Sequence, residues 1–334
     1  MSPTTHETAS RKDSAATAGE SPALSVVMVS YNTRELTLKA LDTLYRHAGY
    51  PLEVIVLDNA SQDGSADAIE ARFPEVRLIR SPENLGFARA NNVAVGYAPG
   101  EVLLLLNPDT EMLPDAVRHL MRLREQNPDA GIWGGRTVYA DGSPNPSSCW
   151  KRQTLWSLAV QATGLSSIRR QSAVLNPERV LTLDSQAPTP VDIVSGCMLL
   201  IDKRLFEQLG GFSPRFFMYG EDADLCLRAR DKGARPLVSA RPTIVHHGGG
   251  SERVPADKLV RLLAAKATLI LEHFPAGKRR AGLVMLAAWP FTRMLAHRML
   301  SLVGRRQSTE RAEVWANVWA RRSEWFAGFP EERQ

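Results

Sequence analysis

The chain has 334 residues, of which 44% are hydrophobic and 23% charged, and its formal net charge is +5. This length predicts one large domain with appendages or two domains, and the apolar content is sufficient for a packed core. The positive charge is confined to the end of the chain: residues 1–255 hold 27 Lys and Arg against 29 Asp and Glu, whereas residues 256–334 hold 14 against 7. A basic nucleic-acid-binding body is therefore excluded.

Two features bear on the cellular compartment. The three cysteines are odd in number and lack metal-type spacing, which indicates buried thiols in a reducing compartment. Residues 1–22 are small and polar and contain no apolar stretch of the kind found in signal peptides. We therefore expect a disordered leader in a cytoplasmic protein.

Strand and helix patterns alternate along the chain. Short apolar runs that end in polar residues predict strands, and apolar residues at helical spacing predict helices. This alternation is typical of βαβ units in a mostly parallel sheet with helices on both faces. The predicted strands are residues 24–29, 54–57, 76–79, 102–106, 131–139 and 191–201, with residues 236–245 partly extended. The predicted helices end near residues 45, 72, 98, 126, 209 and 232.

Residues 141–190 lose this periodicity and are punctuated by prolines. A long irregular segment in a compact enzyme is typically a binding loop or a lid. The loop at residues 246–251, which holds two histidines and three glycines, is predicted to be flexible.

The chain after residue 255 is predicted to be helical. Residues 281–292 contain no charged side chain, but this run is too short to cross about 30 Å of hydrocarbon. Apolar residues at helical spacing beside arginines are typical of a helix that lies in the membrane interface, and packing on the rest of the protein explains the pattern equally well. The apolar residues of this pattern are Leu283, Leu286, Ala287, Phe291, Met294, Leu295, Met299 and Leu302.

Two acidic motifs are the strongest indication of catalytic chemistry in the sequence. Asn107-Pro108-Asp109 follows a wholly apolar run, and Glu221-Asp222 begins a predicted helix after an aromatic stretch. Carboxylates in such places bind hard cations or transfer protons. Asp109 is the candidate ligand of Mg²⁺ or Mn²⁺, and the Glu221-Asp222 pair is the candidate general base with its oriented neighbour. The helix dipole also favours acids in a first turn, which explains part of the second signal.

Further polar residues follow the first two strands. Parallel α/β sheets bind ligands outside the carboxyl ends of their strands, so Asp58 is a candidate acceptor for the imide N–H of a uracil or thymine ring. The alternative is an Asx turn or a helix cap. No GxGxxG motif follows residues 24–29, which argues against dinucleotide binding. The His246-His247 pair is a candidate for metal coordination, with a structural role as the common alternative.

Together these residues resemble family 2 glycosyltransferases of the GT-A fold, and within them the rhamnosyltransferase-like branch that builds cell-surface glycans. Each motif alone is weak, but seven in order are specific to the superfamily. The matching segments are residues 25–32, 54–65, 83–92, 103–111, 195–202, 210–228 and 245–251.

The resemblance implies a GT-A domain in residues 23–255, with an α/β fold and a mostly parallel nucleotide-binding sheet, and a basic amphipathic helical extension in residues 256–334. It implies inverting, metal-dependent transfer from a nucleotide-diphosphate sugar. The first expectation for the donor is dTDP-rhamnose, with a UDP-sugar as the alternative. The acceptor would be a lipid-linked or polymeric glycan at the inner face of the plasma membrane, and the partners would not include nucleic acid.

The resemblance also implies roles for individual residues, at the positions of this sequence that match the family's motifs. Asp109 would hold Mg²⁺ or Mn²⁺ on the diphosphate with His246, or His247 as the fallback; the motif here is NPD, so Asp109 does alone what two acids share elsewhere. Asp222 would be the base, beside Glu221. Asp224 and Trp150 are further candidates, Trp150 as a sugar-stacking platform, although core packing is its commoner role. The residues expected to bind the nucleotide sugar are Ser30, Asn32, Asp58, Asn84, Gly86, Arg89 and Asn107.

Two other classes compete with this interpretation. A sugar-nucleotidyltransferase should carry a loop rich in glycine and basic residues after the first strand, and residues 30–34 lack one. A non-catalytic glycan- or nucleotide-binding module on the same fold would not need Asp109 and Asp222, both of which are present.

Overall fold

The computed structural model describes residues 23–169, 171–180, 182–183, 187–248, 255–302 and 306–330. The predicted leader, residues 1–22, and much of the predicted glycine loop lie outside these ranges. The described strands are β1 Leu24–Ser30, β2 Glu53–Asp58, β3 Arg77–Arg80, β4 Val102–Leu106, β5 Thr110–Met112, β6 Ile132–Val138, β7 Cys149–Trp150, β8 Thr189–Pro190, β9 Ile193–Val194, β10 Met198–Asp202 and β11 Leu237–His246. The described helices are α1 Arg34–His47, α2 Ser65–Arg72, α3 Phe87–Val95, α4 Ala116–Gln126, η1 Pro128–Ala130, α5 Leu155–Thr163, η2 Leu165–Ser167, α6 Lys203–Gln208, α7 Glu221–Asp231, α8 Pro255–His273, α9 Ala276–Leu302, α10 Arg306–Ala320 and α11 Arg322–Trp325.

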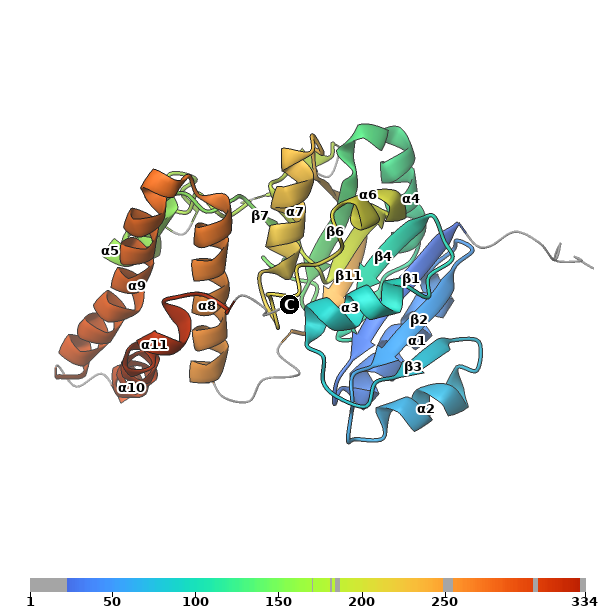
Figure 1. Cartoon of the computed structure of the whole chain (residues 1–334), viewed down its shortest axis with the longest axis horizontal. Coiled ribbons are helices and arrows are strands. Elements are labelled where there is room, and N and C mark those ends of the chain that lie inside the picture. The colour runs from blue at the N-terminus through green and yellow to red at the C-terminus, as the bar shows by residue number, and fades with distance from the viewer. Residues whose placement is uncertain are drawn as a thin grey trace, which may run out of the picture.

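A mixed sheet forms the centre of the larger part of the molecule (Figure 1). Its strand order is β3-β2-β1-β4-β10-β6-β11-β5, with β8 on β11. Strands β1 to β4 are parallel to one another, β10 is antiparallel to both of its neighbours, and β6 and β11 are parallel to each other. The predicted mostly parallel α/β sheet is therefore confirmed, with one antiparallel strand at its centre.

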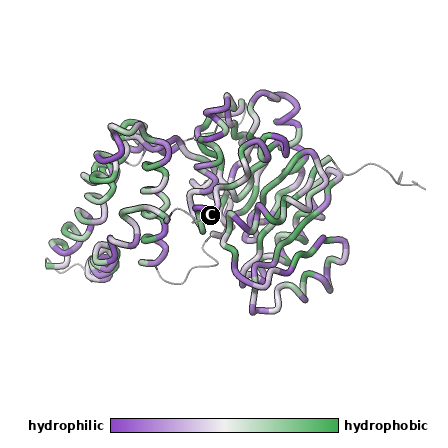
Figure 2. Tube along the Cα trace, in the orientation of Figure 1, coloured by the Kyte–Doolittle hydropathy of each residue, from purple (hydrophilic) through white to green (hydrophobic). Residues whose placement is uncertain are grey.

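Each central strand is apolar on both faces because helices cover both sides of the sheet. In β1, Val27 and Val29 pack against α3, α6 and α7, whereas Val26 and Met28 pack against α1, α2 and α4. Figure 2 shows these strands as the most hydrophobic part of the trace. All three cysteines are buried and unpaired, as predicted.

The C-terminal helices α8 to α11 lie on one side of the sheet and share a separate hydrophobic cluster (Figure 1). Helix α8 joins the two parts, because Ala265 and Leu269 contribute to the core beside the sheet while Leu263 and Ile270 contribute to the helical cluster. Within the described ranges, no helix has the length and apolarity needed to cross a bilayer.

The structure corrects several predictions. The single strand predicted over residues 191–201 is two strands, β9 and β10, because the chain turns at Ser195-Gly196-Cys197. The segment 141–190 is not wholly irregular: it contains β7 and helix α5, which packs against α9. His246 ends strand β11 and does not lie in a loop. Strand β5 was not predicted.

The helix expected in the membrane interface is also only partly as predicted. Leu286 and Met294 are buried in the helical cluster or beside it, with exposures of 0% and 6%. These two residues pack inside the protein, whereas Phe291, Leu295, Met299 and Leu302 of the same predicted stripe are exposed.

Candidate active site

The carboxyl ends of β1 and β2 meet at one edge of the sheet. Ser30 pairs in register with Asp58, whose carboxylate is buried. One carboxylate oxygen of Asp58 accepts the backbone N–H of Ser61 at 3.0 Å, so Asp58 also makes a local turn contact of the kind considered as the alternative role. The other oxygen, Oδ1, is buried and has no hydrogen-bond partner. A buried acceptor of this kind lacks a donor, and a ligand N–H would supply one.

Ser30 contributes to this edge through its backbone. Its hydroxyl is fully buried and lies 3.0 Å from the Thr37 hydroxyl and 3.3 Å from the Thr33 hydroxyl. Its carbonyl oxygen accepts the N–H of Asn59. Ser30 therefore holds β1, α1 and the loop after β2 together.

The loops around this edge are held by side-chain amides. The Asn59 amide donates to Asn84 Oδ1 at 2.9 Å and its oxygen accepts the Leu85 N–H at 2.8 Å. Asn84 Oδ1 also accepts the N–H of Gly86. Asn32, with a φ of 51°, accepts the N–H of Gln62 at 2.7 Å. Asn32 and Asn84 thus order the loops in which they lie.

Gly86 allows a close approach between two distant segments. Its φ is 75°, and a Cβ atom there would lie 2.6 Å from Cδ2 of Phe217 and 2.7 Å from the Phe217 carbonyl oxygen. That carbonyl also accepts the N–H of Phe87, at the start of α3. The aromatic segment before α7 is therefore seated on the N-terminus of α3, which also carries the exposed side chain of Arg89.

Asp109 lies beside His246 because β5 pairs with the end of β11. Thr110 is in register with His246, and Oδ1 of Asp109 lies 3.4 Å from Nε2 of His246. Burial would raise the pKa of Asp109, but His246 and the Gly248 N–H outweigh it, so the pKa lies below its ordinary value. Asp109 is thus held as a carboxylate.

The contacts of His246 allow a tautomer in which Nε2 is an acceptor. The hydroxyl of Ser147 donates to Asn145 Oδ1 at 2.7 Å and lies 3.0 Å from Nδ1 of His246. With its proton engaged, this hydroxyl accepts from Nδ1–H, and Nε2 then carries a lone pair toward Asp109. In this tautomer Nε2 and the Asp109 carboxylate can ligate one cation together; with a proton on Nε2, His246 instead donates to Asp109 and lowers the pKa of that carboxyl.

These residues fit a divalent cation. Besides Asp109 and His246, the site offers Asn107, whose Oδ1 is buried without a partner. Mg²⁺ is bound by one or two carboxylates together with substrate phosphates, so a small donor set is sufficient. No cluster of three or more His, Cys, Asp or Glu side chains with metal-site geometry occurs among the residues that the structure describes.

Asp222, at the start of α7, is held by two backbone groups. One oxygen accepts the N–H of Gly196 at 3.0 Å, and the other accepts the N–H of Ala223 at 2.7 Å. Burial raises the pKa of Asp222 despite these bonds. The pKa of neighbouring Glu221 is raised by burial and by the charge of Asp222, and Oε2 of Glu221 is buried without a partner. The pair is suited to accept a proton.

One turn brings the two acidic motifs together. The carbonyl oxygen of Cys197 accepts the backbone N–H of Asn107 at 3.2 Å. The backbone N–H of the preceding residue, Gly196, donates to the carboxylate of Asp222. Burial, together with the charges of Asp109 and Asp222, raises the pKa of the Cys197 thiol to about 12. Residues separated by more than a hundred positions therefore share one edge of the sheet.

Asp224 is engaged in a different set of contacts. It pairs with Arg228 at 2.7 Å and with Nε2 of His273, on α8, at 2.9 Å. Arg228 in turn donates to the carbonyls of Leu209 and Gly211. These bonds fix α7 against α8 and the preceding turn, which is a structural role for Asp224.

Two other candidates also lie in structural contacts. His247 bonds Glu111 at 2.5 Å, and Glu111 accepts from Lys39 at 2.6 Å. Trp150 is partly buried against the core beside the sheet, which is the core-packing alternative considered above.

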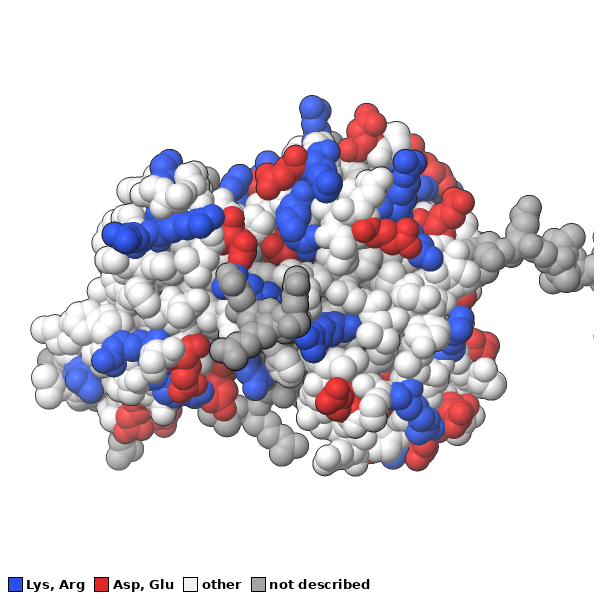
Figure 3. Space-filling view, viewed as in Figure 1, with Lys and Arg blue, Asp and Glu red and all other residues white. Residues whose placement is uncertain are grey.

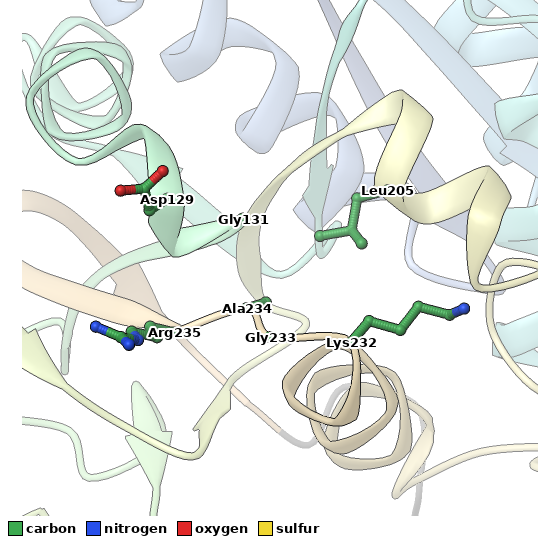
Figure 4. Close-up of a pocket in the computed structure, with 7 residues that line it drawn as sticks. All are labelled: Asp129, Gly131, Leu205, Lys232, Gly233, Ala234 and Arg235. Carbon is green, nitrogen blue, oxygen red and sulfur yellow. The ribbon is translucent and has the colours of Figure 1, made fainter.

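An open cavity on the described surface is remote from these residues. Its volume is about 460 Å³, and it lies at the opposite ends of β6 and β11, where Gly131 and Arg235 precede the strands (Figure 4). Asp109 and His246 lie near the carboxyl end of the sheet. The cavity is therefore not part of the candidate site.

Several residues of the site were not predicted. Gly196, Ser147 and His273 position Asp222, His246 and Asp224 respectively. Only Gly196 carried a sequence signal, as a glycine within a predicted strand, which often marks a bulge or a close backbone approach.

The acidic side chains and unpartnered polar atoms gathered at this edge of an α/β sheet are suited to a group-transfer enzyme. Comparison with known proteins agrees: residues 25–210 match the family model for glycosyl transferase family 2. The chain belongs to this family.

Similar proteins include an N-acetylglucosaminyl-diphospho-decaprenol L-rhamnosyltransferase of Mycobacterium tuberculosis, 30% identical over 71% of this chain and 80% of that protein. A low-salt glycan biosynthesis hexosyltransferase of Haloferax volcanii is 28% identical over 62% of this chain and 61% of its own length. Among solved structures, a mannosyltransferase of Pyrobaculum calidifontis in complex with GDP-Man and Mn²⁺ superposes with a TM-score of 0.57 at 19% identity, over 92% of this chain and 88% of that one. That likeness shows the GT-A fold.

Proposed function

We propose that this glycosyltransferase moves a sugar from a nucleotide-diphosphate donor to a lipid-linked glycan, with inversion at the anomeric carbon. The observation that carries the proposal is the turn at Gly196 and Cys197, which places Asp222 beside the segment of Asn107 and Asp109. Rhamnose from dTDP-rhamnose is the first candidate for the donor, with a UDP-sugar second. The similar rhamnosyltransferase, named for a diphospho-decaprenol acceptor, supports rhamnose as the sugar and a lipid-linked acceptor.

In this proposal the donor lies along the carboxyl ends of β1, β2 and β4. The unpartnered oxygen of Asp58 accepts an N–H of the nucleobase. Asp109, His246 and Asn107 hold Mg²⁺ or Mn²⁺, which when bound would neutralise negative charge on the departing diphosphate. Manganese in solved structures of the same fold supports this assignment.

Asp222 acts as the general base. The acceptor hydroxyl gives its proton to a carboxylate oxygen of Asp222 as its own oxygen attacks the anomeric carbon. The bond between that carbon and the diphosphate oxygen breaks on the opposite side, so no covalent sugar intermediate forms and the configuration inverts. The raised pKa makes Asp222 a stronger base than an exposed aspartate, and general base catalysis typically contributes ~10²–10⁴-fold.

The organisation of the chain is part of the proposal. Residues 23–255 would form the catalytic domain and residues 256–334 a basic extension that contacts the inner face of the plasma membrane. The joining role of α8 and the separate cluster of α8 to α11 support this division.

A transfer assay tests the proposal. Purified protein is incubated with a panel of dTDP-, UDP- and GDP-sugars, Mn²⁺ and a short-chain polyprenyl-diphosphate acceptor, and the product's anomeric configuration is determined by NMR. We expect one donor class to be consumed, with inversion. Retention would exclude the single-displacement mechanism. Formation of a nucleotide sugar would indicate a nucleotidyltransferase, and donor binding without turnover would indicate a binding module.

A further inference from the structure

Helix α9 leaves an apolar face open to solvent. Its exposed large hydrophobic residues have exposed fractions between 38% and 88%. Their spacing of seven, four, four and three residues keeps them on one face of the helix. The opposite side, with Leu286 and Met294, is buried, so α9 is apolar on its covered face and on its open face. The open face consists of Val284, Phe291, Leu295, Met299 and Leu302.

Residues 156–174 extend this surface. Helix α5 packs against α9, where Thr292 donates to the Ala162 carbonyl at 2.6 Å, and Arg293 reaches Ser167 at 3.5 Å. Of the fourteen large hydrophobic residues that are exposed in the described ranges, five lie on α9 and four in this segment. An apolar surface of this extent marks an interaction site. The four residues are Trp156, Leu165, Ile168 and Val174.

The charge around this surface has one sign. Residues 155–174 and 276–302 together contain seven Lys and Arg and no Asp or Glu. In the view of Figure 3 the outer end of α9 is mostly white, with Lys and Arg as the charged side chains along it. Helix α10, which packs against α9, carries the exposed acids Glu310 and Glu313, so the cations of these two segments complement an anionic lipid surface on the side of α9 and α5.

Charge also argues against a second copy of the chain as the occupant. A two-fold dimer through this surface would place the same patch against itself. Cations of one copy, such as Arg298, would then face cations of the other, which is unfavourable.

We propose that this surface, the open face of α9 together with residues 156–174, binds an anionic phospholipid bilayer. The apolar side chains enter the boundary between headgroups and acyl chains, and the flanking arginines contact lipid phosphates. This deepens the proposed function, because a lipid-linked acceptor is presented at such a bilayer. Helix α8, which lies between α9 and α7, connects the surface to the site through His273 and Asp224 (Figure 1).

Vesicle flotation tests the proposal with the full chain. Vesicles of phosphatidylglycerol and phosphatidylcholine are compared with vesicles of phosphatidylcholine alone, for wild type and for the double variant Met299→Glu, Leu302→Glu. The control is Val93→Glu, which introduces one glutamate at an exposed valine on α3. We expect binding to the anionic vesicles that weakens with salt, falls ~10–100-fold in the double variant and is unchanged in the control.

Absence of flotation with anionic vesicles, or equal flotation of the double variant, would overturn the proposal. Analytical ultracentrifugation of the same proteins addresses the second copy: a dimer lost in the double variant, without vesicle binding, would assign the surface to self-association. Transfer to a short, water-soluble acceptor without vesicles is measured in parallel. The double variant should retain that transfer, so loss of vesicle binding and failure of the proposed activity give separate results.

Discussion

The backbone N–H of Gly196 donates to Oδ2 of Asp222 at 3.0 Å, and this bond joins the start of α7 to the turn that precedes β10. Because β10 is antiparallel to β4, that turn lies beside the end of β4, where Asn107 begins the second acidic motif. The antiparallel strand at the centre of the sheet is thus what brings the base to the donor edge.

Replacing Asp222 by Asn should abolish transfer and leave donor binding intact. Asn keeps an oxygen that can accept the Gly196 N–H but cannot take the acceptor proton. We expect the initial rate to fall ~10²–10⁴-fold and the donor Kd to stay within about threefold. Donor titration by calorimetry beside the rate assay checks this. An equal loss of donor affinity would assign Asp222 a structural role.

Replacing Gly86 by Ala should destabilise the contact between α3 and the aromatic segment. A Cβ atom there would overlap the ring and carbonyl of Phe217, and the φ is positive. We expect a loss of about 2 kcal/mol in the free energy of unfolding. Gly142→Ala is the matched control, because its φ of 80° is similar and nothing lies within 4 Å of the added atom. Equal losses in urea unfolding would show that the contact with Phe217 is unimportant.

Replacing Asp224 by Asn should destabilise the protein at neutral pH. Burial opposes ionisation of Asp224, but His273 and Arg228 outweigh it and lower its pKa. Breaking a buried pair of this kind typically costs about 3–5 kcal/mol. Asp42→Asn, at a more exposed pair with Arg46, should cost under ~1 kcal/mol.

The Asp224 effect should depend on pH in a defined direction. A lowered pKa contributes stability that is present above the unfolded value of about 3.9 and is lost as pH falls through the folded pKa. The stability difference between wild type and Asp224→Asn should therefore narrow in acid. A difference that widens as pH falls would contradict the assignment.

Glu221 should make the free energy of unfolding depend on pH in the opposite direction to Asp224. Its pKa is raised by burial and by Asp222, so the neutral form is favoured in the folded protein. The stability that Glu221 contributes is fully present below its unfolded pKa of about 4.3. That stability is lost as pH rises through the raised pKa of the folded state. Wild type should lose more stability than Glu221→Gln between about pH 5 and pH 9. If the stability of wild type and of Glu221→Gln changed equally with pH, Glu221 would not be buried as a neutral acid.

Most of the sheet could be predicted from the sequence because local patterns specify it. Residues 102–106 form β4 at the predicted bounds, and β1, β2, β3 and β6 lie within a residue or so of prediction. Each is a short apolar run followed by polar residues, which needs no tertiary information. The family could likewise be predicted, because its motifs are contiguous in sequence.

The contacts that assemble the site could not be predicted in this way. The bonds of Gly196 to Asp222 and of Ser147 to His246 join residues 26 and 99 positions apart. Such pairs depend on strand order, which the periodicity of one strand does not encode. The break between β9 and β10 was missed because apolar residues resume directly after it, and Ser195-Gly196 was the one local sign of the turn.

The central claim is that Asp109 and Asp222 form one site with separate tasks, and thermal stabilisation by nucleotide sugars tests it most directly. Wild type, Asp109→Ala and Asp222→Asn are melted with dTDP-, UDP- and GDP-sugars, with and without Mn²⁺. Ligand at a hundredfold Kd should stabilise wild type by about 2.7 kcal/mol. We predict a metal-dependent shift for one nucleotide class that is lost in Asp109→Ala and retained in Asp222→Asn. A shift that survives in Asp109→Ala, or no shift with any nucleotide sugar, would contradict the account.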